Sequence, residues 1–183
     1  MANLTEFSLA EAVAVLTRTP ATLDALLRGL PNTWVHCNEG NDTWSALDIV
    51  GHLVCGECTD WMPRVRIILE SGEARAFDPF DRFAQSREPQ NQSLGQRLDD
   101  FARLRKENLA ALQALNLKPG DLTRRGKHPA LGGVTLSQLL ATWATHDLTH
   151  LHQLSRVMAY QYRDAVGPWS VYLGVLRCNG HSE

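Results

Sequence analysis

The stretch WATHDLTHLHQ, residues 143–153, lies in the middle of one long amphipathic run. Apolar residues recur every three or four positions from about Thr135 to Tyr162, which predicts a helix with one buried stripe. His146 and His150 are four residues apart, so their side chains lie on the same face of that helix. His150 falls inside the apolar stripe and His146 lies at its edge. We therefore expect both rings to point into an interface between packed helices.

Two buried imidazoles need partners for their ring nitrogens. A divalent cation such as zinc is one such partner, and a pair of histidines four apart on a helix supplies two ligands. Our candidate for the third ligand is His52, a lone polar ring in the apolar run IVGHLVC, residues 49–55. Three protein ligands leave one coordination position open, which is typical of catalytic zinc sites. Hydrogen-bonded core histidines are the alternative, and spacing alone does not separate the two.

Composition and charge narrow the class of protein. The chain has 183 residues, of which 44% are hydrophobic and 21% charged, with a formal net charge of -2. These values predict a single globular domain, residues 1–183. Near-neutral charge gives no electrostatic footprint for nucleic acid or an anionic membrane, and the small cluster Arg103, Arg105 and Lys106 is interpreted as a solvated helix face. No secretory signal pattern and no membrane-spanning apolar run is present, so we expect a cytoplasmic protein.

Three further runs have the helical period, and together with residues 135–162 they predict an all-α four-helix bundle. The first is Phe7–Leu30, in which Pro20 is expected to cause a kink or a break. The second is Trp44–Glu70, which should bend ahead of Pro63. The third is Leu94–Leu115.

Two long connections separate these runs. Residues 71–92 carry apolar anchors at Phe77, Phe80 and Phe83, which indicates a packed crossover. A long connection here lets the second and third helices run parallel. Residues 116–134 are rich in glycine and proline and predict a second irregular connection with short extended pieces. A short final helix is expected at Trp169–Leu176.

Several short motifs resemble one known family, the DinB/YfiT-like superfamily, and the resemblance covers nearly the whole chain. The motifs are WSA at 44–46, VGHL at 50–53, HP at 128–129, and TWATHD at 142–147 followed by His150 and Gln153. The resemblance implies an up-down-down-up four-helix bundle with a long crossover between helices 2 and 3. It also implies a divalent metal, often zinc or nickel, bound by three histidines, which on this chain are His52, His146 and His150.

The resemblance also implies candidate functions. Characterised relatives include transferases that join bacterial low-molecular-weight thiols to electrophiles, and a thiol-dependent isomerase. Many members of the family form homodimers. The leading hypothesis is therefore a metal-dependent thiol S-transferase that acts on a small molecule with a low-molecular-weight thiol as cosubstrate. A metal-activated hydrolase is the enzymatic alternative. A non-catalytic metal-binding stress-response protein and a purely structural bundle remain as further alternatives.

Asp147, Gln153 and His128 are polar residues within or beside these motifs, and each has an expected role. Asp147 should point into the apolar stripe, where a carboxylate requires a partner. We favour a position in which it accepts a ring N–H from a ligand histidine and fixes its tautomer; a general base, or a structural pairing with an arginine or helix cap, are the alternatives. Gln153 is expected to hydrogen-bond across the bundle rather than to orient a ligand. His128 is expected near the mouth of the site but not on the metal.

Overall fold

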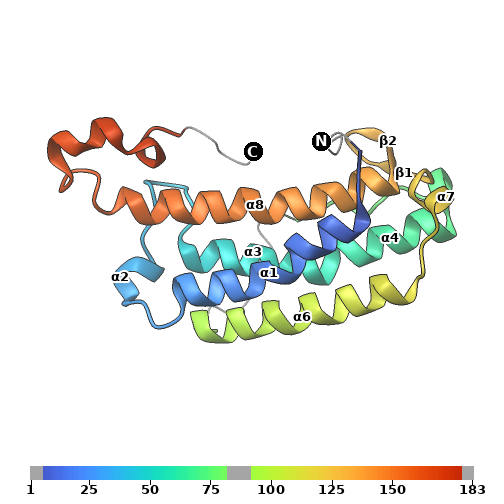
Figure 1. Ribbon diagram of the computed structural model, residues 1–183, viewed down its shortest axis with the longest axis horizontal. Helices are drawn as coiled ribbons and strands as arrows, with labels where there is room; N and C mark the ends of the chain where they lie inside the picture. Colours follow the sequence, from blue (N-terminus) through green and yellow to red (C-terminus); the bar gives the residue numbers. More distant parts are fainter. Residues whose placement is uncertain (1–5, 82–91, 179–183) are drawn as a thin grey trace.

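The computed structural model describes residues 6–81 and 92–178, and its long helices form a four-helix bundle (Figure 1). The colours in Figure 1 show that the first and last long helices run in one direction and the other two in the opposite direction. This is the up-down-down-up arrangement that the resemblance implied. The bundle helices are α1 (Leu9–Leu27), α3 (Ala46–Thr59) continued by α4 (Trp61–Glu70), α6 (Leu94–Ala114) and α8 (Leu136–Tyr160).

Short elements fill the connections between the bundle helices. The irregular connection before α8 contains an antiparallel hairpin of two strands, so the expected short extended pieces are confirmed. The expected final helix is instead a pair of 3₁₀ turns. The short elements are α2 (Asn32–Val35), η1 (Gly72–Ala74), α7 (Pro119–Leu122), β1 (Arg125–His128), β2 (Gly132–Thr135), η2 (Gly167–Tyr172) and η3 (Gly174–Leu176).

The two internal prolines act differently on their helices. The chain leaves the helix at Asp60, and Pro63 lies in the first turn of α4, where a missing N–H does not matter. By contrast, α1 continues through Pro20, so of the two expected outcomes, a kink or a break, the break is excluded. Pro20 cannot donate to the carbonyl of Leu16, four residues earlier, but Nη1 of Arg105 donates to that oxygen at 2.9 Å. A buried side chain from α6 thus replaces the hydrogen bond that the proline removes.

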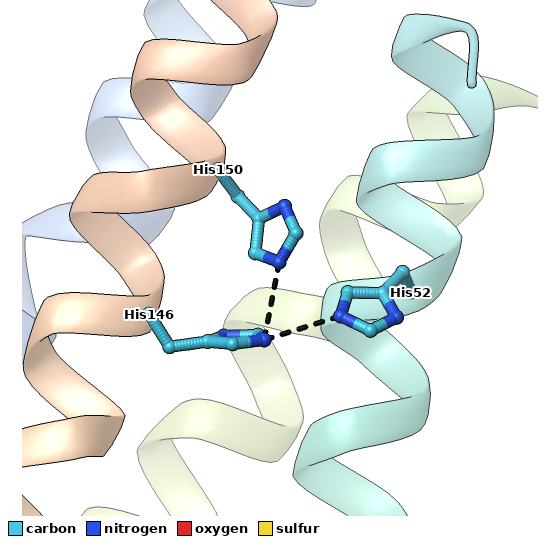
Figure 2. Close-up of side chains that lie close together, drawn as sticks. All are labelled: His52, His146 and His150. Carbon is cyan, nitrogen blue, oxygen red and sulfur yellow. Dashed lines mark hydrogen bonds between the residues drawn. The ribbon is translucent and has the colours of Figure 1, made fainter. Parts of the chain in front are cut away.

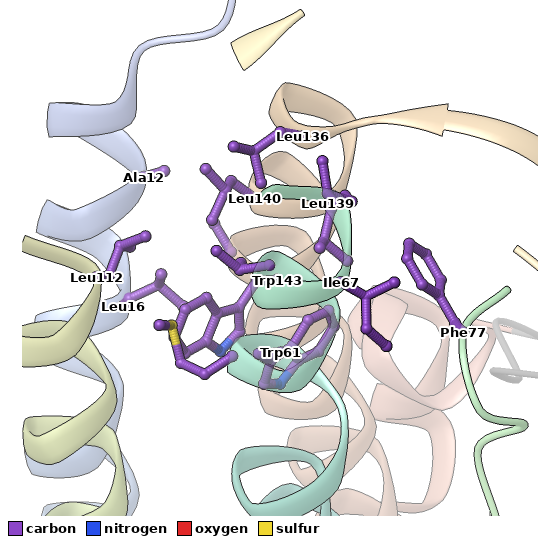
Figure 3. Packing of buried hydrophobic residues seen from close by; sticks show 14 residues of the cluster. Ala12, Leu16, Trp61, Ile67, Phe77, Leu112, Leu136, Leu139, Leu140 and Trp143 are labelled. Carbon is purple, nitrogen blue, oxygen red and sulfur yellow. The ribbon is translucent and has the colours of Figure 1, made fainter. Parts of the chain in front are cut away.

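One cluster of the core is built around two tryptophans (Figure 3). Trp143 of α8 is fully buried and stacks on Trp61 of α4, with ring centroids 5.7 Å apart and an interplanar angle of 11°. Leu140 of the same helix and Leu16 of α1 belong to the same buried cluster. The apolar stripe of α8 therefore faces both α1 and α4, which fixes the rotation of α8 about its axis.

The crossover between α4 and α6 begins as a packed segment, as expected. The backbone N–H of Phe77 donates to the carbonyl of Lys127 in β1 at 2.9 Å, and its ring is buried. Phe83, the third expected anchor, lies outside the described residues. Within residues 6–81 and 92–178, no helix is both long enough and apolar enough to cross a membrane.

Candidate metal centre

Three histidine rings from two helices meet in the interior of the bundle (Figure 2). His52 extends from α3, and His146 and His150 extend from α8. The Nε2 atom of His146 lies 3.1 Å from the Nε2 of His52 and 3.1 Å from the Nε2 of His150. All three ligand atoms lie within 4.8 Å of one another. The predicted convergence of residues distant in sequence is therefore confirmed as geometry.

Gln153 sets the tautomer of one ring. Its Oε1 lies 2.8 Å from Nδ1 of His150, one helical turn away. An amide oxygen can only accept, so Nδ1 of His150 carries the proton and Nε2 presents a lone pair to the other rings. The expectation that Gln153 bonds across the bundle is wrong, since it orients a histidine of its own helix.

Hydrogen bonds among the rings do not satisfy this arrangement. Nε2 of His146 carries either one hydrogen or one lone pair, yet it has two Nε2 neighbours at equal distance, so the two contacts cannot both be full hydrogen bonds. A second proton on His146 does not resolve this, because burial and the nearby His150, His52 and Arg105 lower its pKa to about 2. The Nδ1 atom of His146 is buried with no hydrogen-bond partner among the described residues. A cation among the three Nε2 atoms would remove the conflict.

The donor set fits a divalent metal. Two ligands at about 2.0–2.1 Å from a tetrahedral zinc lie about 3.3 Å apart, close to the 3.1 Å between the imidazole nitrogens. All three donors are neutral nitrogens, which suit zinc, nickel or another borderline metal better than magnesium or calcium. His52, His146 and His150 are the residues that would hold it, and all three line the cavity described below.

Aromatic rings surround the three histidines and restrict how they move. The indole of Trp44 lies 4.7 Å from the ring of His52, measured between centroids, and Phe80 meets the same ring edge-on at 5.3 Å. Trp61 meets His146 edge-on at 5.1 Å. These contacts hold the rings in place and keep the surroundings apolar, so interactions with a bound cation are weakly screened.

A cavity of about 640 Å³ opens on the triad. Its lining comes from α3, α4, the start of the crossover, the hairpin turn and α8, and it is mostly aromatic and aliphatic. The lining residues besides the triad are Trp44, Gly56, Asp60, Trp61, Arg64, Phe77, Pro79, Phe80, His128, Pro129, Ala130, Leu131, Val134, Gln138, Leu139 and Thr142. A larger groove of about 1010 Å³ lies between α1 and α6, but it includes none of the three histidines.

Two charged residues of this cavity were not anticipated from the sequence. Asp60 and Arg64, one turn apart at the start of α4, form an ion pair of 2.5 Å. Burial raises the pKa of Asp60 to about 6, although Arg64 opposes the shift. His128 also lines the cavity, as expected for a residue at its mouth. Within the described chain it is not part of the metal-ligand cluster.

Asp147 does not meet a histidine, contrary to the favoured expectation. Its carboxylate is fully buried and accepts two hydrogen bonds from Arg105, from Nη1 to Oδ2 at 2.6 Å and from Nη2 to Oδ1 at 2.9 Å. The structural pairing with an arginine is therefore the alternative that the structure supports. Because both oxygens are engaged and shielded from solvent, Asp147 is not placed to act as a general base.

Arg105 is the centre of a buried network behind the triad, so the expectation of a solvated face is wrong for this residue. Its Nε and Nη2 also donate to Oε1 of Glu57, at 3.1 and 2.8 Å. Glu57 in turn accepts from Nε1 of Trp143 and Nδ2 of Asn108. Burial alone would lower the pKa of Arg105, but its two carboxylate partners raise it above the ordinary value. The network joins α6 to α3 and α8, the two helices that carry the three histidines.

The fold and the site together define a class: a four-helix bundle whose buried histidine triad faces an apolar cavity. Comparison with known families agrees with this, and the chain belongs to the DinB superfamily, whose family model matches residues 15–154. Among solved structures, the chain is similar to YfiT from Bacillus subtilis, described as a probable metal-dependent hydrolase with an unusual four-helix bundle topology. That similarity has a TM-score of 0.71 at 19% identity and covers 84% of this chain and 87% of the other. No curated protein matches.

Proposed function

We propose that this protein is a divalent-metal-dependent enzyme of the low-molecular-weight-thiol S-transferase type. The observation that carries the proposal is the convergence of three Nε2 atoms, from His52, His146 and His150, on the wall of a largely apolar cavity. A metal bound there would supply Lewis acidity, lowering the pKa of a coordinated thiol or water. A thiol activated in this way needs no separate general base, and Asp147 is not available as one.

The remaining residues would position the reactants. Gln153 holds the His150 ring in the tautomer that presents Nε2 to the metal. Trp44, Trp61 and Phe80 exclude water and would pack against an apolar electrophile. In the reaction, the thiolate sulfur forms a bond to the electrophilic carbon, and the leaving group departs with the electron pair of the bond that breaks. The thiol proton passes to solvent.

A metal-activated hydrolase is the second candidate. It is favoured by Asp60, whose carboxyl lines the same cavity and has a pKa raised to about 6, a suitable range for accepting a proton from water. The description of YfiT as a probable metal-dependent hydrolase points the same way. Against this role stands the ion pair with Arg64, which already occupies one oxygen of Asp60.

Turnover experiments separate these candidates. Purified protein loaded with zinc or nickel is incubated with a panel of bacterial low-molecular-weight thiols and electrophiles, and products are identified by mass spectrometry. Metal-dependent conjugates that are absent with the His146→Ala variant support the transferase. Products formed at the same rate without thiol support the hydrolase, and absence of any product over a broad panel supports a non-catalytic metal-binding protein.

The same proposal includes the type of substrate, the cellular location and the oligomeric state of the enzyme. Near-neutral net charge is compatible with a small-molecule substrate rather than nucleic acid or an anionic membrane. We further propose a cytoplasmic location and a homodimer. Sedimentation equilibrium tests the second point directly, since a mass near 20.4 kDa would exclude a dimer.

A further inference from the structure

We propose that Arg64 and His128 form a binding subsite for a carboxylate, so that the electrophilic substrate is an apolar or aromatic carboxylic acid. The subsite lies in the same cavity as the histidine triad. The proposal names the substrate class for the proposed enzyme and to that extent rests on it. The experiment below therefore measures ligand binding both with and without metal.

Arg64 has donors to offer to a ligand. Its side chain is only 11% exposed, and its guanidinium carbon lies 5.3 Å from the ring centroid of Phe77, which holds the group in place. Within the described residues, its only acidic partner is Asp60, reached through Nη2. A guanidinium carries five N–H donors in a planar fork that matches a carboxylate. Several of these donors are therefore left for a group inside the cavity.

His128 adds a second donor at the hairpin turn. Its Nδ1 accepts the backbone N–H groups of Ala130 and Leu131, at 3.1 and 3.2 Å. The ring proton of the neutral imidazole must then lie on Nε2, which is a donor. Burial and the nearby positive charge of Arg64 lower the pKa of His128, so the ring is neutral at neutral pH. The turn thus fixes one tautomer with its donor available.

The other polar groups of the cavity lining do not offset these donors. Gln138 closes the capping box of α8 by accepting from the N–H of Thr135 at 2.8 Å, and the hydroxyl of Thr142 donates to the carbonyl of Gln138 at 2.8 Å. The indole N–H of Trp61 has no acceptor among the described residues. Among the described side chains of the lining other than the triad, donors therefore exceed acceptors, since Asp60, the one carboxylate there, already accepts from Arg64 through one oxygen. A cavity with surplus donors and a buried guanidinium in its lining selects an anionic oxygen group.

The apolar lining of the cavity determines which kind of ligand body can accompany the carboxylate. Besides the groups above, the lining is aromatic or aliphatic, including Phe77, Phe80 and Leu139. A volume of about 640 Å³ is within the usual range for small-molecule sites. An apolar body with one carboxylate would cover the walls and place its charge at Arg64.

The test uses 1-naphthylacetate and its neutral counterpart 1-naphthylacetamide, which have nearly the same shape. Dissociation constants are measured by isothermal titration calorimetry on zinc-loaded and metal-free full-length protein. The variants are Arg64→Gln, Asp60→Asn, and Arg66→Gln as a matched control on an exposed arginine of the same helix. We expect wild-type protein to bind the acid roughly tenfold more tightly than the amide in both metal states, the lower end for a hydrogen bond to a charged group.

The variants should move this preference in opposite directions. Arg64→Gln should reduce it to about onefold, and Arg66→Gln should leave it unchanged. Asp60→Asn should increase it, because the competing carboxylate is removed while the guanidinium remains; this gain also excludes simple misfolding as the cause. Equal binding of acid and amide by the wild type overturns the proposal. So does a preference that disappears without zinc and persists in Arg64→Gln, since the carboxylate would then lie on the metal. Absence of zinc binding, with the preference intact, overturns only the proposed enzyme.

Discussion

Replacing Asp147 by asparagine separates a structural role from a role at the metal. In the structure, the carboxylate makes two buried hydrogen bonds to Arg105 and none to a ring nitrogen. The amide of asparagine keeps the size of the side chain but turns one acceptor into a donor, which would face an N–H of Arg105. The substitution should therefore damage the network of Arg105 and Glu57 while leaving the three histidines in place.

The magnitude follows from what remains around Arg105. Removing one partner of a buried ion pair typically costs about 3–5 kcal/mol. Arg105 keeps two hydrogen bonds to Glu57 and one to the carbonyl of Leu16, so it is not left without acceptors. We therefore expect the lower end, a loss of about 3 kcal/mol in the free energy of unfolding.

Urea denaturation of the metal-free Asp147→Asn variant measures this loss, and competition with a chromophoric chelator measures the metal dissociation constant under conditions where the variant is folded. Gln153→Ala is the matched counterpart because Gln153 does contact a ligand ring. It should lower the free energy of unfolding by only about 1 kcal/mol. It should weaken metal binding by about 10–100-fold, the usual effect of removing a group that orients a metal ligand.

The opposite pattern would refute this interpretation. If Asp147→Asn weakened metal binding 100-fold with stability unchanged, the carboxylate would act on a histidine in solution and not on Arg105. If Gln153→Ala left metal affinity unchanged, the hydrogen bond to His150 would have no role at the site.

Other predictions concern the cavity and the hairpin. Burial raises the pKa of Asp60 from 3.8 to about 6 in the folded state, so the folded protein binds this proton more tightly and the contribution of Asp60 to stability falls as pH rises between these values. The unfolding free energy of Asp60→Asn relative to wild type should therefore rise by up to about 3 kcal/mol from pH 4 to pH 7. Urea titrations that give the same difference between the two proteins at both pH values would contradict this. Gly126→Ala would place a methyl group 2.6 Å from Ile68 and 2.9 Å from Phe77, and overpacking of this kind should cost about 1–3 kcal/mol. Gly120→Ala meets nothing within 4 Å and should be neutral or slightly stabilising in thermal melts; equal effects of both substitutions would argue against a packed hairpin.

Much of the fold was predictable because its signals are local. The helical period and the capping boxes, such as Thr135 with Gln138, define where helices begin and how they face the core. The triad was predictable for a similar reason: His146 and His150 share a helix face, and His52 interrupts an apolar run. The orientation of the three rings depends on side-chain geometry that residue spacing does not specify. The same is true of the hydrogen bond by which Gln153 fixes the tautomer of His150.

Three features of the structure were not predicted, and each has its own physical reason. Its charged neighbours predict a solvated face for Arg105, although it lies in register with Leu98, Phe101 and Leu112 on the buried stripe of α6, a signal present in the sequence. The continuity of α1 through Pro20 requires the guanidinium of Arg105 to reach the carbonyl of Leu16. No local sequence pattern in α1 indicates that partner.

The pair of Asp60 and Arg64 was not predicted either, because i, i+4 ion pairs are ordinarily expected on surfaces rather than in cavities.

Metal content of tag-free protein is the most direct test of the metal centre. Inductively coupled plasma mass spectrometry, after loading with zinc or nickel and removal of excess metal, should find one ion per chain in the wild type. His146→Ala should lose that ion, whereas His152→Ala, which alters an exposed histidine of the same helix, should retain it. A wild-type protein that holds no metal, or a His146→Ala variant that holds as much as the wild type, would contradict the proposed metal centre.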